Sequence, residues 1–463
     1  MFIGFISIIL CTFAVPFQCK MKARNRQILQ IALPSIISNI TVPLLGLIDV
    51  AIVGHLGAPA YIGAIAVGGM LFNIIYWLFA FLRMGTSGMT SQALGRRDLP
   101  EVVRLLLRSM GIGLAAALCL IALQIPVRQL AFLLIQPTDE VRQLASLYFH
   151  ICIWGAPAML GLYGLTGWYI GMQNSRVPMY IAITQNLVNI AASLCLVFLC
   201  GMKVDGVALG TLIAQYAGLA MGLILWWAQY GKLQKYIRFR GQLQREAMGR
   251  FFRVNRDIFL RTLCLVAVTL FFTSAGAAQG DIILAVNTLL MQLFTLFSYV
   301  MDGFAFAGEA LSGRYIGARN REAFTDTLRH LFRWGLLMTV LFTLAYLCGG
   351  NAFLGLLTDN AEVIDAAGAY FYWAVAIPAA GIAAFIWDGV FIGATATRGM
   401  LVSMAVAAAC FFLLYYSLRP VLANHALWLA FLAYLFVRGA AQSLLAGGVI
   451  RKAFRPTPSP TTP

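Results

Sequence analysis

The chain has 463 residues, of which 61% are hydrophobic and only 11% are charged, and its mean hydropathy is +0.83. Soluble domains carry about 25% charged residues, so this composition excludes a soluble enzyme, a fibrous protein and a disordered linker. The net charge of +16 does not indicate nucleic-acid binding, because the basic residues lie in short loops between apolar stretches.

Long apolar runs dominate the chain from about residue 28 onward. Each is long enough to cross a bilayer as a helix, and none shows the alternating pattern of barrel strands. We therefore predict an all-α integral membrane protein. Its twelve transmembrane helices are expected near 28–53, 60–84, 105–125, 143–170, 177–200, 204–229, 258–279, 282–308, 331–357, 363–393, 399–419 and 425–447.

The basic residues orient these helices. Short cytoplasmic loops of membrane proteins carry an excess of Lys and Arg. With both termini in the cytoplasm, all but four of the 33 Lys and Arg residues fall on the cytoplasmic side; the four are Arg128, Arg142, Lys203 and Arg419. The basic linker 230–257 and the tail 451–463 are then cytoplasmic.

Residues 1–20 allow two interpretations. The stretch from Phe2 to Phe17 is apolar but short for a span, and its positive charges follow it instead of preceding it as in a signal peptide. Met21 begins the sequence MKARNRQ, a natural cytoplasmic approach to the first span. Either Met21 is the physiological start, or residues 1–20 form an additional interfacial segment.

The chain contains an internal repeat. GRRD at 95–98 matches GARN at 317–320, IGMQNSR at 170–176 matches IGATATR at 392–398, and Tyr148-Phe149 matches Tyr370-Phe371, all with an offset of 222. An even number of spans per copy makes the two copies parallel, related by an axis along the membrane normal. We predict an N-lobe at 21–229 and a C-lobe at 258–450, an arrangement suited to alternating access.

Asp49 is the acid placed deepest in an apolar span. Ionisable groups in hydrocarbon are costly and are functional candidates by default. A carboxylate held away from water can bind and release a proton within physiological gradients. A proton or cation coupling site is one interpretation, and a helix-packing carboxylate is the other. Pro34, earlier on the same helix, is expected to kink it, because proline removes a backbone donor.

Other polar residues lie within the spans. Asn186, Asn189 and Ser193 have the spacing of one helical face and could converge on Asp49 or bond neighbouring helices. The first-lobe candidates for a cavity and its hydrogen-bond network are Tyr148, Thr166, Asn186, Asn189, Ser193 and Thr211. The second-lobe candidates are Asp302, Glu309 and Asp388, for which structural pairing with Arg or helix N–H groups is the alternative.

No motif for a cofactor, a metal or catalysis stands out. The sequence has no P-loop, so we expect no ATP-driven transport within this chain, and its four His residues lack the spacing of metal ligands. A membrane enzyme would need paired acids or a His cluster in the spans. We therefore predict a chain that is not an enzyme and has no cofactor.

Four segments together resemble the multidrug and toxic compound extrusion (MATE) family, within it the DinF-type branch. They are LPSIISNITVPLLGLIDVAIVGHLG at 33–57, SQALGRRD at 91–98, DGFAFAGEALSGRYIGARN at 302–320 and WDGVFIGATATR at 387–398. The resemblance covers roughly residues 22–450 and implies a V-shaped bundle of six plus six helices that exports drug-like compounds against H⁺ or Na⁺. It implies that Asp49 is the first-helix carboxylate and Pro34 the kink proline. It also places Tyr148, Thr166, Asn189 and Thr211 among the polar residues of the N-lobe cavity.

Ser193 departs from this pattern, because many relatives carry a second acid there. Without that acid a Na⁺ site loses an anionic ligand, whereas one carboxylate suffices for a proton. We therefore predict a secondary antiporter of a prokaryotic inner membrane that exports amphipathic, cationic compounds against H⁺, with Na⁺ as the less favoured ion. Its expected partners are the bilayer, its small-molecule substrates and the ion, and we expect a monomer. The alternatives are a lipid-linked-precursor flippase, which would need a strongly cationic cleft, and a channel.

Overall fold

The computed structural model describes residues 23–54, 59–135, 138–237, 245–358 and 360–455, and these are almost entirely helical. The segment 1–20, the centre of the basic linker and the end of the tail lie outside these ranges. Within the described residues, eleven helical segments are long and apolar enough to cross a membrane, beginning with Ala60–Gly95 and ending with Asn424–Ala453. Together with the helix that contains Asp49, they confirm an all-α membrane protein with twelve long helical segments.

The first half of the chain forms the N-lobe. Its helices are α2 (Ala23–Gly54), α3 (Pro59–Leu78), α4 (Phe81–Gly95), α5 (Leu99–Ala122), α6 (Gln124–Ile135), α7 (Asp139–Cys152), α8 (Ala156–Gly171), α9 (Arg176–Leu194) and α10 (Val204–Tyr230). The second half forms the C-lobe, with α11 (Arg245–Ala277), α12 (Asp281–Gly317), α13 (Arg321–Leu357), α14 (Ala361–Gly368), α15 (Phe371–Gly393), α16 (Thr397–Leu422) and α17 (Asn424–Ala453).

Helix bounds differ from the predictions in several places; the span predicted at 60–84 divides into α3 and α4, and the span predicted at 143–170 divides into α7 and α8. The span predicted at 258–279 starts earlier, because α11 is helical from Arg245 through the polar end of the linker. The stretch after the third span continues as α6, which was not predicted because Gln124, Arg128 and Gln129 make it too polar and short for a span. The span predicted at 363–393 divides into α14 and α15.

Each lobe has its own hydrophobic core, and α2 contributes side chains to both cores. Ile28, Leu29 and Ile31, near the start of α2, are buried in the core of the C-lobe beside α12 and α13. Ile52, near its end, is buried in the core of the N-lobe. Burial of apolar side chains fixes each half of this helix to a different lobe. The helix therefore connects the lobes mechanically as well as covalently.

The structure repeats at the offset found in the sequence. Arg97 and Arg319 both have positive φ angles, of 61° and 56°, in the turns that follow α4 and α12. In the next residues, Asp98 and Asn320 cap α5 and α13 by accepting hydrogen bonds from the backbone N–H groups of Glu101 and Ala323. Side-chain oxygens at this position satisfy N–H groups that a helix start leaves free. The matched loops therefore encode the same turn and helix start in each lobe.

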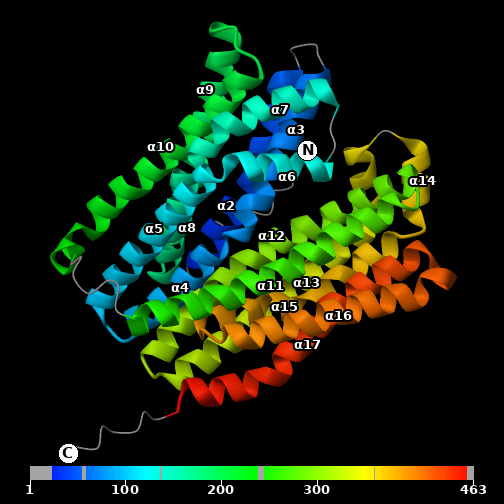
Figure 1. Cartoon of the computed structure of the whole chain (residues 1–463). Helices are drawn as coiled ribbons and strands as arrows, with labels where there is room; N and C mark the ends of the chain where they lie inside the picture. Colours follow the sequence, from blue (N-terminus) through cyan, green and yellow to red (C-terminus); the bar gives the residue numbers. More distant parts are fainter. Residues whose placement is uncertain (1–22, 55–58, 136–137, 238–244, 359, 456–463) are drawn as a thin grey trace, which may run out of the picture.

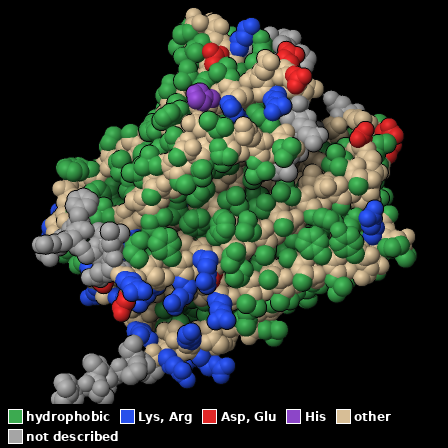
Figure 2. Space-filling model, viewed as in Figure 1, with side chains coloured by type: hydrophobic (Ala, Val, Ile, Leu, Met, Phe, Trp, Pro, Cys, Tyr) green, Lys and Arg blue, Asp and Glu red, His purple; other side chains and the backbone are tan. Residues whose placement is uncertain are grey.

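The two lobes converge at one end of the molecule and diverge toward the other (Figure 1). The loops 95–98, 172–175 and 318–320 lie at the converging end, joined by contacts such as that of Arg314 with Gln173. We call it the basic end, since Lys and Arg side chains gather there, and the opposite end the far end (Figure 2). Close packing across the basic end depends on glycines: a Cβ on Gly95 would lie 2.1 Å from the Arg314 carbonyl oxygen, and one on Gly317 would lie 2.1 Å from that of Gln92.

Candidate functional site

Asp49 lies in the far half of α2, inside the N-lobe, with only 5% of its surface exposed. Its carboxyl group has the side chains of Thr211 on α10 and Asn189 on α9 as hydrogen-bonding neighbours. The Asn189 amide also donates to the Thr211 hydroxyl at 3.0 Å, so that the two residues brace each other. Among the described residues no basic side chain forms an ion pair with Asp49. We call Asp49, Tyr148, Asn189, Ser193 and Thr211 the N-lobe site.

Glycines allow the helices around this site to approach each other. A Cβ on Gly210 of α10 would lie 2.2 Å from the Ser193 hydroxyl oxygen and 2.9 Å from its backbone nitrogen. A Cβ on Gly68 of α3 would lie 2.4 Å from the ring of Tyr148, which is itself buried. Such distances are far below normal carbon contacts. Gly210 therefore lets α9 meet α10 beside Ser193, and Gly68 makes room for the Tyr148 ring.

Three buried oxygen atoms of the N-lobe site have no hydrogen-bond partner in the described part of the chain. They are Oδ1 of Asp49, Oδ1 of Asn189 and Oγ of Ser193. Buried polar atoms are normally bonded, and exceptions point to strain, to a water or to a bound ion. All three can accept a hydrogen bond from a protonated group or water. The site thus offers acceptors for a proton or a small cation, with one carboxylate among them.

The other first-lobe candidates form bonds outside this cluster. The Thr166 hydroxyl donates to the Leu162 carbonyl of its own helix α8 at 2.7 Å. The Asn186 amide donates to the Thr41 carbonyl at 2.9 Å and so ties α9 to α2. Of the six candidates predicted from the sequence, Tyr148, Asn189, Ser193 and Thr211 make up the N-lobe site together with Asp49. Thr166 and Asn186 serve local and interhelical hydrogen bonding.

Pro34 lies in the basic half of α2, and its missing N–H leaves the Gln30 carbonyl without its usual helical donor. The hydroxyl of Ser175, in the turn before α9, lies 3.3 Å from this carbonyl oxygen and 2.8 Å from that of Ile31. Ser175 is fully buried against α2. The turn after α8 therefore supplies a donor at the point where the proline interrupts the helix.

In the C-lobe, Asp388 of α15 is held by basic neighbours. Arg261 of α11 donates to one carboxylate oxygen, and a nitrogen of Arg438 lies 3.7 Å from the same oxygen. The amide of Gln442 donates to the other oxygen at 2.6 Å. All four side chains are buried. Two arginines neutralise a single carboxylate here, so Asp388 is engaged in a structural network within this lobe.

The remaining second-lobe candidates lie on α12. A carboxylate oxygen of Glu309 is 3.7 Å from a nitrogen of Arg83, which belongs to α4 of the N-lobe. This contact shows that Glu309 faces the other lobe. Asp302 has no ion pair or hydrogen bond in the described structure, although the charge of Arg83 acts on it. Arg83 and Arg438 received no role from the sequence, because both count among the basic residues assigned to the cytoplasmic side.

Comparison with known proteins decides the family. The MatE family model matches residues 34–195 and 258–421 of this chain. The DNA damage-inducible protein F of Escherichia coli K12 is 38% identical over 426 residues, covering 90% of this chain and 91% of that protein. The chain belongs to the MATE family. It is a multi-pass membrane transporter for small molecules, in the class of multidrug and toxic compound efflux.

Further relatives and solved MATE structures agree with this assignment. The probable multidrug resistance protein NorM of Thermotoga maritima is 20% identical over 349 residues, covering 74% of each chain. The Vibrio cholerae MATE transporter VcmN in the bent form has a TM-score of 0.81 over 93% of this chain and 98% of its own, at 18% identity. A MATE family transporter in an outward-facing conformation has a TM-score of 0.79 over 93% and 96% of the two chains. These structures establish the MATE fold of the chain.

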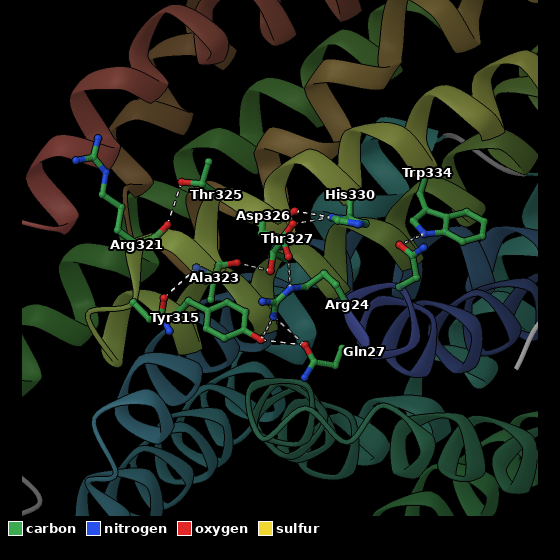
Figure 3. A network of polar contacts seen from close by, with 12 residues as sticks. Arg24, Gln27, Tyr315, Arg321, Ala323, Thr325, Asp326, Thr327, His330 and Trp334 are labelled. Atoms are coloured by element: carbon green, nitrogen blue, oxygen red, sulfur yellow. Dashed lines mark hydrogen bonds and ion pairs between the residues drawn. The ribbon is translucent and has the colours of Figure 1, made fainter. Parts of the chain in front are cut away.

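At the basic end of this MATE transporter, a network of side chains joins the start of α2 to α12 and α13 of the C-lobe (Figure 3). Arg24, at the start of α2, donates from Nε to Asp326 of α13 at 2.9 Å and from Nη1 to the hydroxyl of Tyr315 of α12. The Tyr315 hydroxyl also bonds Gln27 at 3.0 Å, and Asp326 lies 3.2 Å from the ring of His330. We call Arg24, Gln27, Tyr315, Asp326 and His330 the α2 latch.

Sequence analysis did not find the α2 latch. Arg24 and Asp326 are 302 residues apart, and in the sequence each resembles an ordinary charged residue of a loop. The pairing follows only from the packing of α2 against α12 and α13. The repeat offset gives no signal for it, since the latch joins different helices of the two lobes.

Proposed function

We propose that this MATE transporter exports amphipathic organic cations from the cytoplasm in exchange for protons, and that Asp49 is the residue that binds the proton. The observation that carries the proposal is a buried carboxylate in the N-lobe, without a basic partner among the described residues, surrounded by hydroxyl and amide groups. Intramembrane carboxylates of this kind are typical of proton pathways.

Protons fit the N-lobe site better than Na⁺. Sodium, like other hard cations, is best held by several oxygen ligands of which some are charged. Here Ser193 provides a hydroxyl where a second carboxylate would strengthen such a site, and its Oγ lies against Gly210. A proton needs only one carboxylate and a hydrogen-bond acceptor for the protonated form. The unpartnered Oδ1 of Asn189 is such an acceptor.

The basic end faces the cytoplasm in this proposal, since cytoplasmic loops are rich in Lys and Arg. The α2 latch and the glycine contacts between α4 and α12 then close the cytoplasmic side, and the diverging lobes are open toward the outside. In this proposal the chain lies in a bacterial inner membrane, and the arrangement of its lobes represents an outward-facing state. Proton binding from outside would favour return to the inward-facing state if Asp49 is neutral in one state and ionised in the other.

Transport by purified protein in liposomes tests this proposal. Export of ethidium is measured under an imposed pH gradient and, separately, under an imposed Na⁺ gradient, for wild type and Asp49→Asn. Asp139→Asn, an exposed carboxylate at the start of α7, is the matched control. We expect the pH gradient alone to drive export, Asp49→Asn to abolish it and Asp139→Asn to preserve it. Export that follows only the Na⁺ gradient, or that survives in Asp49→Asn, contradicts the proposal.

A further inference from the structure

One face of α12 presents a carboxylate, an aromatic ring and a second carboxylate in succession. Asp302, Phe306 and Glu309 are spaced by four and three residues, which places them on one side of a helix over about two turns. We call these three residues the α12 strip. Asp302 and Phe306 are partly exposed, whereas Glu309 is only 1% exposed. The strip therefore runs from an open region of the molecule into its interior.

The guanidinium of Arg83 already occupies this strip. Its central carbon lies 4.2 Å from the centroid of the Phe306 ring, and one of its nitrogens lies 3.7 Å from Glu309. Its charge also acts on Asp302. A planar cation over an aromatic face with carboxylates beside it is a favourable arrangement. Arg83 belongs to α4 of the N-lobe, so the other lobe inserts a cation into a site on the C-lobe.

Arg83 is not bonded tightly in this position. Its Nη1 atom and the Oε1 atom of Glu309 are both buried and have no hydrogen-bond partner in the described structure. Hydrogen-bonded arginine–carboxylate pairs are closer than 3.7 Å and often bidentate. Asp388 has Arg261 and Arg438 of its own lobe, and both arginines also act on Asp302, so that with Arg83 three arginines face three carboxylates in this region. Withdrawal of Arg83 would therefore leave the strip with an excess of negative charge and with Oε1 of Glu309 as a buried acceptor.

A path of polar residues leads to the strip from the far end. On the same face of α12, Gln292 is exposed and Thr295 and Tyr299 are partly exposed, one turn apart in succession before Asp302. The opposite approach is blocked by α4, which is packed against α12 and α15 through Gly88, Gly95 and Gly313. Separation of the lobes at the basic end would withdraw α4, and Arg83 with it, from the strip.

We propose that the α12 strip is a binding site for planar organic cations, and that Arg83 is a tethered competitor that refills it when the basic end closes. This inference rests on the proposed export of cations. In the inward-facing state the uncovered strip binds the cargo by its two carboxylates and the Phe306 ring. As the lobes close at the basic end, Arg83 returns to the ring and displaces the cargo toward the open far side. The site differs from the N-lobe site, where the proton binds.

Equilibrium binding of ethidium, a planar cation, to the detergent-purified full chain tests the proposal. Arg83→Gln removes the competitor while keeping both carboxylates, so we expect ethidium to bind about tenfold more tightly than to wild type. Phe306→Leu and Glu309→Gln, each placed in the Arg83→Gln background, should reverse most of that gain. Arg104→Gln, which removes an arginine paired with Glu101 on α5, is the control and should leave the affinity unchanged.

Unchanged or weaker ethidium binding by Arg83→Gln overturns the proposal, as does a gain that persists without Glu309 and Phe306. Arg83→Lys covers the case in which Arg83→Gln fails to fold, because it keeps the charge and loses the planar stacking. It should bind ethidium a few-fold more tightly than wild type. If wild type binds ethidium and replacement of Arg83 does not change the affinity, this inference is wrong but the proposed function still stands. Absence of ethidium binding in every variant also defeats the cationic cargo of the proposed function.

Discussion

The amide of Asn189 on α9 donates a 3.0 Å hydrogen bond to the hydroxyl of Thr211 on α10, and both side chains neighbour the Asp49 carboxyl of α2. The first helix α2 and the consecutive helices α9 and α10 therefore meet in one polar cluster. In an apolar surrounding such bonds are worth more than in water and specify a unique arrangement. A change in the charge of Asp49 would be transmitted to α9 and α10 through this pair.

Thr211→Val tests this transmission, because valine has nearly the same shape and lacks the hydroxyl. A hydrogen bond to a charged group contributes roughly 1.5–3 kcal/mol, so we expect pH-driven export to fall about tenfold or more. Thr325→Val is the control, since the Thr325 hydroxyl is exposed and bonds only its own helix. Equal export rates for Thr211→Val and wild type would show that Thr211 does not support the carboxylate.

Gly210→Ala should damage the N-lobe site sterically. The new methyl group would lie 2.2 Å from Oγ and 2.9 Å from the backbone nitrogen of Ser193, so that α9 and α10 must move apart. Overpacking of this kind typically costs about 1–3 kcal/mol. We expect a lower melting temperature in detergent and reduced export. Gly111→Ala on α5 is the control, because nothing lies within 4 Å of that position. A variant as stable as Gly111→Ala would refute the close approach of these helices.

The α2 latch predicts a change in the balance between conformations. Arg24→Gln loses the ion pair with Asp326 and should raise the population closed at the far end about threefold, since a partly exposed ion pair contributes up to about 1 kcal/mol. Distances between spin labels at residues 140 and 362, exposed at the far ends of the lobes, report this population in a background without native cysteines. Arg321→Gln, close to the latch but exposed, should have no effect. Identical distance distributions for Arg24→Gln and wild type would exclude a latch.

The sequence was sufficient for most of the architecture. Apolar runs predicted the long helices, and the offset of 222 predicted two lobes whose turns at Arg97 and Arg319 share a left-handed backbone. Apolar runs and repeated short motifs can both be recognised in a linear sequence. The start of α11 at Arg245 was missed because a polar amphipathic helix end does not differ from a loop in hydropathy.

The candidate site was only partly predictable. Asp49 stands out because burial of a lone acid in an apolar span is visible in the sequence, and Asn189 follows from helical spacing. Pairings between lobes, such as Arg83 with Glu309 and Arg24 with Asp326, depend on the register of one bundle against the other. No periodicity within either lobe encodes that register. The two arginines around Asp388 show the same limit within one lobe, because they come from α11 and α17.

Proton release on addition of cargo tests the central claim most directly. Ethidium is added to detergent-purified protein in weak buffer, with and without Na⁺, and the pH of the solution is recorded for wild type and Asp49→Asn. Because cargo and proton favour different states of the protein, we expect wild type to release protons whether or not Na⁺ is present, and Asp49→Asn to bind ethidium without release. Ethidium binding by wild type without proton release, or equal release by Asp49→Asn, would contradict proton exchange at Asp49.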